Sequence, residues 1–206
     1  MKFRFLFIPI VAAIFFSCQN QQSQIPILGA PIETKNGTEY PTIKPFSFVD
    51  QDSTIITNKT FENKIYVADF FFLNCGTICP KMTKQMKRLY NEFKDEPNVF
   101  FLSHTIDPQH DSVKQLKQHA LLLGVETTKW HFVTGNEDSI YNIAEHSYYS
   151  SAHADSTADG GLIHSGGFIL IDKNKNVRGI YDGTDPTATA KLMITIKTLL
   201  KEQFQK

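Results

Sequence analysis

An apolar run at residues 65–73 constrains the fold of this chain more than any other feature of its sequence. The run reads Ile-Tyr-Val-Ala-Asp-Phe-Phe-Phe-Leu, and Asp69 is its one charged member. A strand with one solvated face alternates apolar with polar residues, whereas a strand covered on both faces is apolar almost throughout. The run therefore predicts the central strand of a sheet that is covered by helices on both faces.

Other periodic segments predict helices and strands that alternate around this strand. One helix is predicted from apolar residues that recur on a single face: Met82, Met86, Leu89, Tyr90 and Phe93. Further strands are expected at residues 99–106 and 130–133, and further helices at 112–123, at 139–144 and from Pro186 onward. Turn-rich stretches predict hairpins at 46–57 and 167–181. This order predicts an α/β fold with a mixed central sheet flanked by helices and an N-terminal hairpin extension.

The N-terminus of the chain has the pattern of a secretory signal. Lys2 and Arg4 precede an apolar run at residues 5–16, which is shorter than the roughly 20 residues that span a bilayer. The run ends in Phe15-Phe16-Ser17-Cys18, and a polar tract follows directly. This arrangement resembles a bacterial lipobox, although the two phenylalanines differ from the usual leucine and small residue. The resemblance implies cleavage before Cys18 and a lipid on its thiol; an uncleaved anchor or a buried helix is the alternative.

The chain is accordingly predicted to have three parts. Residues 1–17 form the signal peptide, residues 18–44 the lipidated cysteine and a flexible tether, and residues 45–206 the folded domain. We expect an exported protein that is lipid-anchored to a bacterial membrane and faces the periplasm. Basic and acidic residues number 21 each, so no positive excess is available for a phosphate backbone and nucleic acid is not an expected partner.

The other two cysteines, Cys75 and Cys79, lie where the central strand ends and the first helix is predicted to begin. In α/β sheets this end of the strands is where sites form. Pro80 suits the first position of a helix, so Cys79 is predicted to cap it, with its sulfur near the positive helix end that favours a thiolate. A close pair in an oxidising compartment indicates redox chemistry or a soft metal, and two buried structural cysteines are the alternative.

Three motifs together resemble the Sco/SenC family. They are Phe70-Phe71-Phe72 before the C-x-x-x-C-P pattern, Ser103-His104-Thr105-Ile106-Asp107-Pro108, and Ile163-His164-Ser165 ahead of the apolar strand that ends in Asp172. The resemblance covers about residues 42–203. It implies a thioredoxin-like fold, copper bound by Cys75, Cys79 and His164, and assembly of the binuclear copper centre of cytochrome c oxidase.

The resemblance also implies partners and further residues near the copper. The copper-binding subunit of cytochrome c oxidase is the expected recipient, and other copper chaperones or thioredoxin-like reductants are candidate partners. Asp107 is implied as a residue that supports the ligands. Gly76 stands where a proline often follows the first cysteine of the family, a difference that removes no ligand.

The chemistry of these residue types independently favours copper. Copper(I) prefers soft thiolates and copper(II) accepts thiolate together with imidazole, so two sulfurs and one nitrogen can hold both states. His164 has the best position for a third ligand, and His146 and His153 share its polar loop and are candidates to assist. The chain has no proline between Pro108 and Pro186, whereas thioredoxin-like oxidoreductases resemble one another in a cis-proline that faces the cysteines. A glycine there leaves room for an imidazole or a metal.

Two classes of function remain open from the sequence, and whether the protein is an enzyme depends on which is correct. The first is a metallochaperone, and the second is a thiol-disulfide reductase that acts on cysteines of the oxidase or of other exported proteins. Both use Cys75 and Cys79, but only copper binding needs His164. A peroxidase is a weaker third class, because the nearest arginine in sequence is Arg88.

Asp69 favours the reductase. It lies six positions before Cys75, the offset of the buried carboxylate of thioredoxin, which is thought to take up a proton during thiol exchange. Desolvation would raise its pKa and suit it to accept a proton. The alternative is an aspartate that is paired with nearby backbone or with a lysine.

Overall fold

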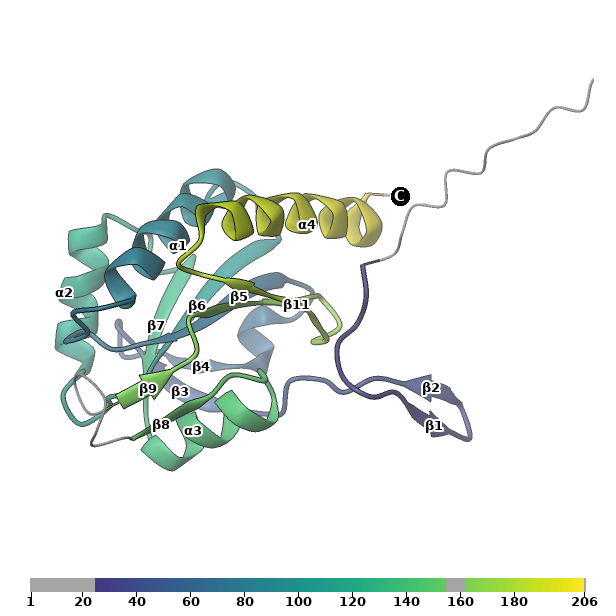
Figure 1. The fold of residues 1–206 in the computed structure, drawn as a ribbon, viewed down its shortest axis with the longest axis horizontal. Helices are drawn as coiled ribbons and strands as arrows, with labels where there is room; N and C mark the ends of the chain where they lie inside the picture. The colour runs from purple at the N-terminus through teal and green to yellow at the C-terminus, as the bar shows by residue number, and fades with distance from the viewer. Residues whose placement is uncertain (1–24, 155–161, 206) are drawn as a thin grey trace, which may run out of the picture.

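The computed structural model describes residues 25–154 and 162–205, so the predicted signal peptide and Cys18 lie outside the described residues. A seven-stranded mixed sheet has the strand order β11-β10-β5-β6-β7-β3-β4 (Figure 1). Its strands are β3 (Ser47–Asp50), β4 (Ile55–Thr57), β5 (Ile65–Phe71), β6 (Val99–Thr105), β7 (Trp130–Thr134), β10 (Gly167–Ile171) and β11 (Val177–Asp182). The pairs β5–β6 and β6–β7 are parallel and the other pairs are antiparallel.

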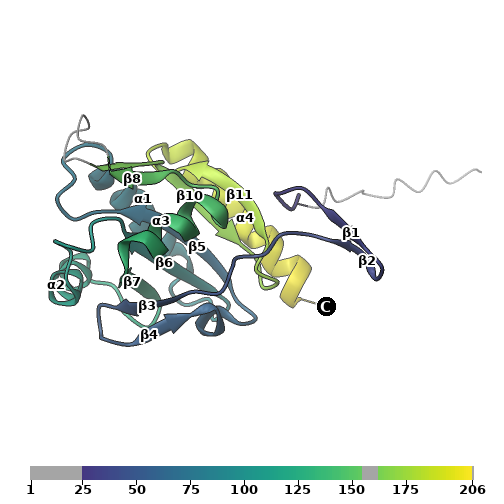
Figure 2. The same ribbon diagram turned by 90° about the horizontal axis from the view of Figure 1, so that it is seen from below.

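The predicted central strand is confirmed, because β5 is buried at every position and has neighbours on both sides. Helices cover both faces of the sheet, with α1 and α4 on one face and α3 on the other (Figures 1 and 2). The helical elements are η1 (Asn58–Phe61), α1 (Cys79–Phe93), α2 (Val113–Leu123), α3 (Glu137–His146) and α4 (Pro186–Phe204). The expected α/β fold is therefore present.

The five residues predicted to form the apolar face of α1 are all buried. They pack against the sheet and α4. Tyr90 illustrates the packing, with its ring centroid 5.9 Å from that of Trp130 on β7. The next helix, α2, begins with a capping box between Ser112 and Gln115 and ends at Gly124, whose left-handed φ of 60° suits glycine. These local signals fix the two helices that follow β5 and β6.

The hairpin predicted at residues 46–57 is present as β3 and β4, which pair antiparallel. It is joined to the main sheet, because β3 also pairs with β7. A separate two-stranded sheet, β1 (Ile32–Thr34) and β2 (Gly37–Glu39), precedes it. The extension at the N-terminus is therefore this earlier hairpin, and the predicted one is an edge of the sheet.

Residues 25–28, which we call the N-terminal strap, lie against the edge strand β11. The backbone N–H of Leu28 donates to the carbonyl oxygen of Val177 at 2.8 Å. Arg178 donates from its side chain to two carbonyl oxygens of the strap. The guanidinium is buried and pairs with the Asp172 carboxylate at 2.7 Å. This part of the segment that composition assigns to a flexible tether therefore has fixed contacts with the domain.

Within residues 25–154 and 162–205, no helix combines the length and the hydropathy that crossing a membrane requires.

Candidate metal centre

The two cysteines lie on a loop between β5 and α1. The chain leaves β5 at Phe71 and reaches Cys75, which is half-buried, while Cys79 is the first residue of α1 and only 5% exposed. The prediction that Cys79 caps this helix is wrong by one residue, because Ile78 is the N-cap and Pro80 stands one position further in. Proline is tolerated throughout the first helical turn, so its position did not fix the exact start.

His164 reaches the cysteines from a small arm of two antiparallel strands, β8 (Ala152–Ala154) and β9 (Leu162–His164). The arm is held at its base, where the hydroxyl groups of Ser150 and Ser165 lie 2.7 Å apart. The backbone N–H of Ser165 also donates to the carbonyl oxygen of Ser151 at 2.9 Å. These contacts bring a histidine that is remote in sequence to the start of α1.

The structure assembles three metal donors from these elements. Nε2 of His164 lies 3.3 Å from Sγ of Cys79, and the donor atoms of Cys75, Cys79 and His164 all lie within 4.8 Å of one another. Both cysteines are free thiols. Two sulfurs and one imidazole nitrogen form a soft donor set, which suits copper and does not suit magnesium or calcium.

A protein-family model described as SCO1/SenC matches residues 34–201, which is most of the chain. The chain belongs to this family.

Solved structures of the family resemble the present fold. A SCO1/SenC family lipoprotein from Bacillus anthracis is 30% identical with a TM-score of 0.70, and the match covers 84% of this chain and 98% of that one. BsSco, described as a member of the Sco family of cytochrome c oxidase assembly proteins with a disulfide switch, is 28% identical with a TM-score of 0.68, covering 84% and 96%. Copper-bound ScoI from Arabidopsis thaliana is 21% identical with a TM-score of 0.63, covering 75% and 98%, a likeness of fold.

In this SCO1/SenC protein the two thiols have opposite electrostatic environments. Partial burial acts against the Cys75 thiolate, but hydrogen bonds from Cys79 and from Thr77 outweigh it and lower the pKa of Cys75. Burial raises the pKa of Cys79 strongly, and its contacts with Cys75 and the nearby Asp69 carboxylate act in the same direction. The expectation of a thiolate at Cys79 is therefore wrong, because burial outweighs the helix end, and Cys75 is the cysteine that ionises first.

The imidazole of His164 is suited to bind a metal through Nε2. Burial lowers the pKa of His164, so the ring is neutral near pH 7. Nδ1 lies 3.2 Å from the carbonyl oxygen of Ser165, which only accepts hydrogen bonds. The proton therefore resides on Nδ1, and the lone pair of Nε2 faces Cys79.

Gly166 lies opposite the N-terminus of α1. The sequence predicts a glycine at this place, where thioredoxin-like oxidoreductases have a cis-proline that faces the cysteines. A Cβ added to Gly166 would lie 3.6 Å from Cδ1 of Ile78 and 3.8 Å from Sδ of Met82, which are ordinary contacts. The first turn of the helix and the segment after His164 therefore pack closely here, with room for no more than a methyl group.

Asp69 is buried in the central strand beneath the cysteines. Burial raises the pKa of Asp69 to about 7, and a hydrogen bond with Ser103 acts in the opposite direction. Its Oδ1 has no hydrogen-bond partner among the described residues, and no lysine is paired with it there. This environment is that of a carboxyl group able to take up a proton near neutral pH.

The remaining sequence candidates lie outside the group of three donors. Asp107 follows β6 and its Oδ1 lies 2.7 Å from Nδ1 of His110. His146 ends α3 and His153 lies on β8, and both side chains are exposed. Among the described residues, the one group of potential metal ligands contains Cys75, Cys79 and His164. The structure therefore does not bring Asp107, His146 or His153 into it.

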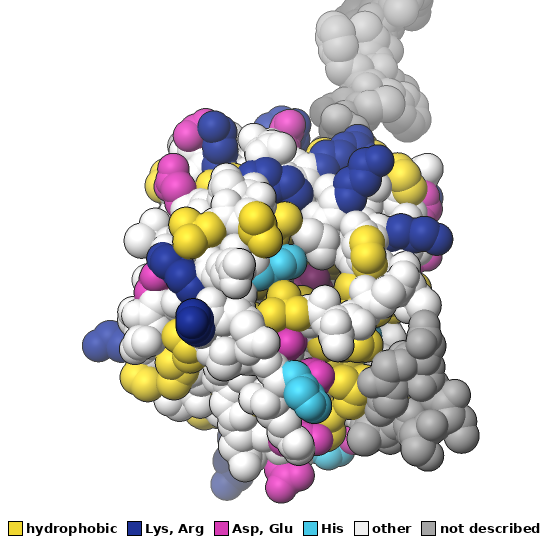
Figure 3. All heavy atoms as spheres, turned by 90° about the vertical axis from the view of Figure 1, so that its left-hand side faces the viewer, with side chains coloured by type: hydrophobic (Ala, Val, Ile, Leu, Met, Phe, Trp, Pro, Cys, Tyr) yellow, Lys and Arg dark blue, Asp and Glu magenta, His cyan; other side chains and the backbone are white. Residues whose placement is uncertain are grey.

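Figure 3 shows the face at the end of the sheet where β9 and the start of α1 lie. Hydrophobic side chains are scattered over the middle of this face, and several Lys and Arg side chains gather above them. This face therefore combines exposed apolar side chains with a group of basic side chains at its upper edge.

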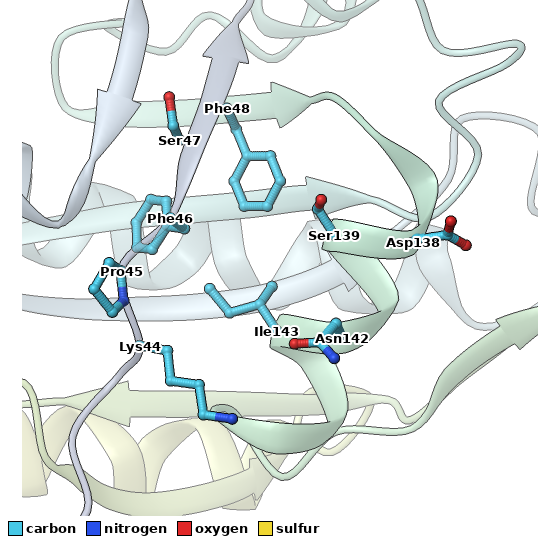
Figure 4. A pocket seen from close by; sticks show the side chains of 9 residues that line it. All are labelled: Lys44, Pro45, Phe46, Ser47, Phe48, Asp138, Ser139, Asn142 and Ile143. Atoms are coloured by element: carbon cyan, nitrogen blue, oxygen red, sulfur yellow. The ribbon is translucent and has the colours of Figure 1, made fainter.

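His104, which stands in the second motif, is not part of this centre. It is fully buried against Phe70 and Tyr148, and burial lowers the pKa of His104 to about 3. Beyond it, Phe46 and Phe48 line a pocket of about 590 Å³ between β3 and α3 (Figure 4). None of the three metal donors lines that pocket.

Proposed function

We propose that this protein is a copper metallochaperone that binds one copper ion through Cys75, Cys79 and His164. The observation that carries the proposal is the assembly of these three donors within 4.8 Å of one another, from two segments far apart in sequence. Structural relatives described as copper-bound, and BsSco described as belonging to a family of cytochrome c oxidase assembly proteins, support the same reading. The recipient would be the copper-binding subunit of cytochrome c oxidase.

The different exposures of the ligands suggest an order of binding. Cys75 is half-buried and has the lower pKa, so it is the thiolate that first meets copper(I). Cys79 is buried and protonated in the free protein, so completing the site releases its proton. Delivery also begins at Cys75, because a recipient's ligand can reach the metal beside it while Cys79 and His164 still hold the ion.

The site is suited to copper in both oxidation states. Two thiolates satisfy copper(I) almost alone, whereas copper(II) gains more from the harder imidazole nitrogen of His164. Titration of the wild type and of His164→Ala with each state tests the proposal. We expect a large loss of copper(II) affinity and a changed thiolate-to-copper absorption band, with a smaller loss for copper(I). Full copper(II) affinity and an unchanged band in the variant would refute the three-ligand site.

A second candidate, a thiol-disulfide reductase, is favoured by Asp69. In that reaction the Cys75 thiolate attacks a disulfide of the substrate protein and one substrate thiolate leaves. Cys79 then attacks Cys75 and releases the second substrate thiolate, so that the enzyme is oxidised to a disulfide and the substrate is reduced. Asp69 would accept the Cys79 proton in this second step. Reduction of a model disulfide protein by the wild type, slowed in Asp69→Asn but not in His164→Ala, would establish this activity.

The location follows from the N-terminal pattern. Export, cleavage before Cys18 and a lipid on its thiol would place the domain on the periplasmic side of a bacterial membrane. The relative from Bacillus anthracis described as a lipoprotein supports this arrangement. A diacylated cysteine holds a protein at a membrane far better than one acyl chain does.

A further inference from the structure

A side chain from outside the Cys75 loop, Asp111, accepts a backbone hydrogen bond from it. The backbone N–H of Leu73, two residues before Cys75, donates to Oδ2 of Asp111 at 3.1 Å. The loop's own turn is weaker, since the N–H of Cys75 lies 3.4 Å from the carbonyl oxygen of Phe72. Among the described residues, no other side chain from beyond residues 72–78 accepts a backbone N–H of this loop.

Asp111 is itself rigidly held. It is 2% exposed, and Thr105 at the end of β6 donates its hydroxyl to the same Oδ2. The backbone N–H of Asp111 donates to the carbonyl oxygen of Asp107 at 2.8 Å. The next residue, Ser112, is the N-cap of α2. The carboxylate therefore links the start of the cysteine loop to two elements of the core.

This hydrogen bond concerns Cys75 in particular, because Cys79 and His164 are held in place by other contacts. Cys79 is fixed in the first turn of α1 and His164 by the β8–β9 arm, and the two are already in contact. Cys75 lies between Asn74 and Gly76, which are exposed, and a Cβ at Gly76 would meet nothing within 4 Å. Leu73 and Ile78 are partly buried against the core, and the hydrogen bond from Leu73 to Asp111 is the polar contact that fixes the backbone of the loop next to Cys75.

We propose that Asp111 is a positioning residue for the copper site, which holds Leu73 so that the Cys75 thiolate stays within reach of Cys79 and His164. The proposal deepens the proposed function, because it states what sets the geometry of the ligand that first meets copper. Asp111 touches no metal and acts through the backbone of the loop.

Two measurements on Asp111→Ala test it. Alkylation of Cys75 in the metal-free protein, followed by mass spectrometry of the peptides, should accelerate about tenfold, the factor for losing one hydrogen bond to a charged acceptor. Copper(II) affinity should fall about tenfold, and the thiolate-to-copper absorption band should shift. Asp111→Asn should restore both values, because its amide oxygen can accept both hydrogen bonds.

Asp50→Ala is the matched control. Asp50 is equally buried and its Oδ1 accepts the backbone N–H groups of Asp52 and Thr54, but it lies on β3 away from the cysteines. It should lower the melting temperature while leaving the absorption band and the Cys75 alkylation rate unchanged. Equal effects of the two alanine variants on alkylation and on the band would overturn the proposal.

Two further outcomes are decisive. If Asp111→Ala does not fold, Thr105→Val removes the hydroxyl that holds the carboxylate, and it should change alkylation and the band in the same direction but less; no change would refute the role of Asp111. If the wild type binds no copper, the proposed function fails. The alkylation measurement, which needs no metal, still decides whether Asp111 holds the loop.

Discussion

Replacing Arg178 with alanine tests how the N-terminal strap is held to the domain. The substitution removes the side-chain donors to the two strap carbonyl oxygens and leaves the Asp172 carboxylate, which is 1% exposed, without its positive partner. Removing one member of a buried ion pair costs about 3–5 kcal/mol. Asp172 keeps hydrogen bonds from the backbone of Asn174 and Asn176, so we expect the lower end, about 3 kcal/mol.

The expected change is large enough to measure by thermal and urea unfolding. For a chain of this size, about 3 kcal/mol corresponds to a melting temperature lower by about 6–12 °C. Lys197→Ala, which removes an exposed ion pair with Glu92, is the control and should change stability by less than about 1 kcal/mol.

A second readout follows the strap itself. Trypsin cleaves after Lys35, which lies in the turn between β1 and β2, the hairpin that joins the strap to the domain, whereas Pro45 protects the bond after Lys44. We expect Arg178→Ala to be cut faster after Lys35 and to keep the copper affinity of the wild type. A loss of stability below about 1 kcal/mol with unchanged cleavage would refute our account of how the strap is held.

The other predictions concern the cysteines, Asp69 and the anchor. Under mild oxidation Cys75 and Cys79 should form a reversible disulfide that blocks copper(I), and thiol counting that still finds both thiols would contradict this. In the reduced protein, peptide mass spectrometry should find Cys75 alkylated before Cys79, with its rate rising at lower pH than for an ordinary thiol, because hydrogen bonds lower its pKa against the effect of burial. Burial raises the pKa of Asp69 to about 7, so the folded protein loses stability as pH rises from about 4 to 7. Asp69→Asn should avoid this loss, and its advantage in urea unfolding should grow to at most roughly 4 kcal/mol at pH 8; a constant difference would argue against the raised pKa. Cys18→Ser should be exported without lipid, and unchanged lipid labelling would exclude Cys18 as the acceptor.

The sequence predicts the framework well because its signals are local. The apolar run of β5, the single apolar face of α1 and the capping box of α2 are each decided within a few residues, and the structure has all three. The exact start of α1 was not predictable from Pro80, because proline is accepted at more than one position of the first turn.

Long-range contacts account for what the sequence did not predict. His164 was predicted to join Cys75 and Cys79, but the arm of two short strands that carries it to Cys79 across 85 residues was not, because its segment is polar and has no strand pattern. The lower pKa belongs to Cys75 because burial, which follows from tertiary packing, outweighs the helix end at Cys79. Asp111 gave no signal, since one aspartate before a helix is common and its contact with Leu73 depends on the pairing of β5 with β6.

The strap has a consequence for how the domain would stand on a membrane. Arg178 lies at the start of β11, beside the end of β10, whereas His164 precedes the start of β10, so the strap and the group of Cys75, Cys79 and His164 occupy opposite ends of the sheet (Figure 1). From Cys18 to Ile25 the chain advances seven residues, which span at most about 25 Å. With a lipid on Cys18, the end of the sheet that carries the strap would stay within about 25 Å of the bilayer, and the cysteines would lie at the opposite end of the domain. A recipient would then have to present its copper site about one domain height above the lipid surface.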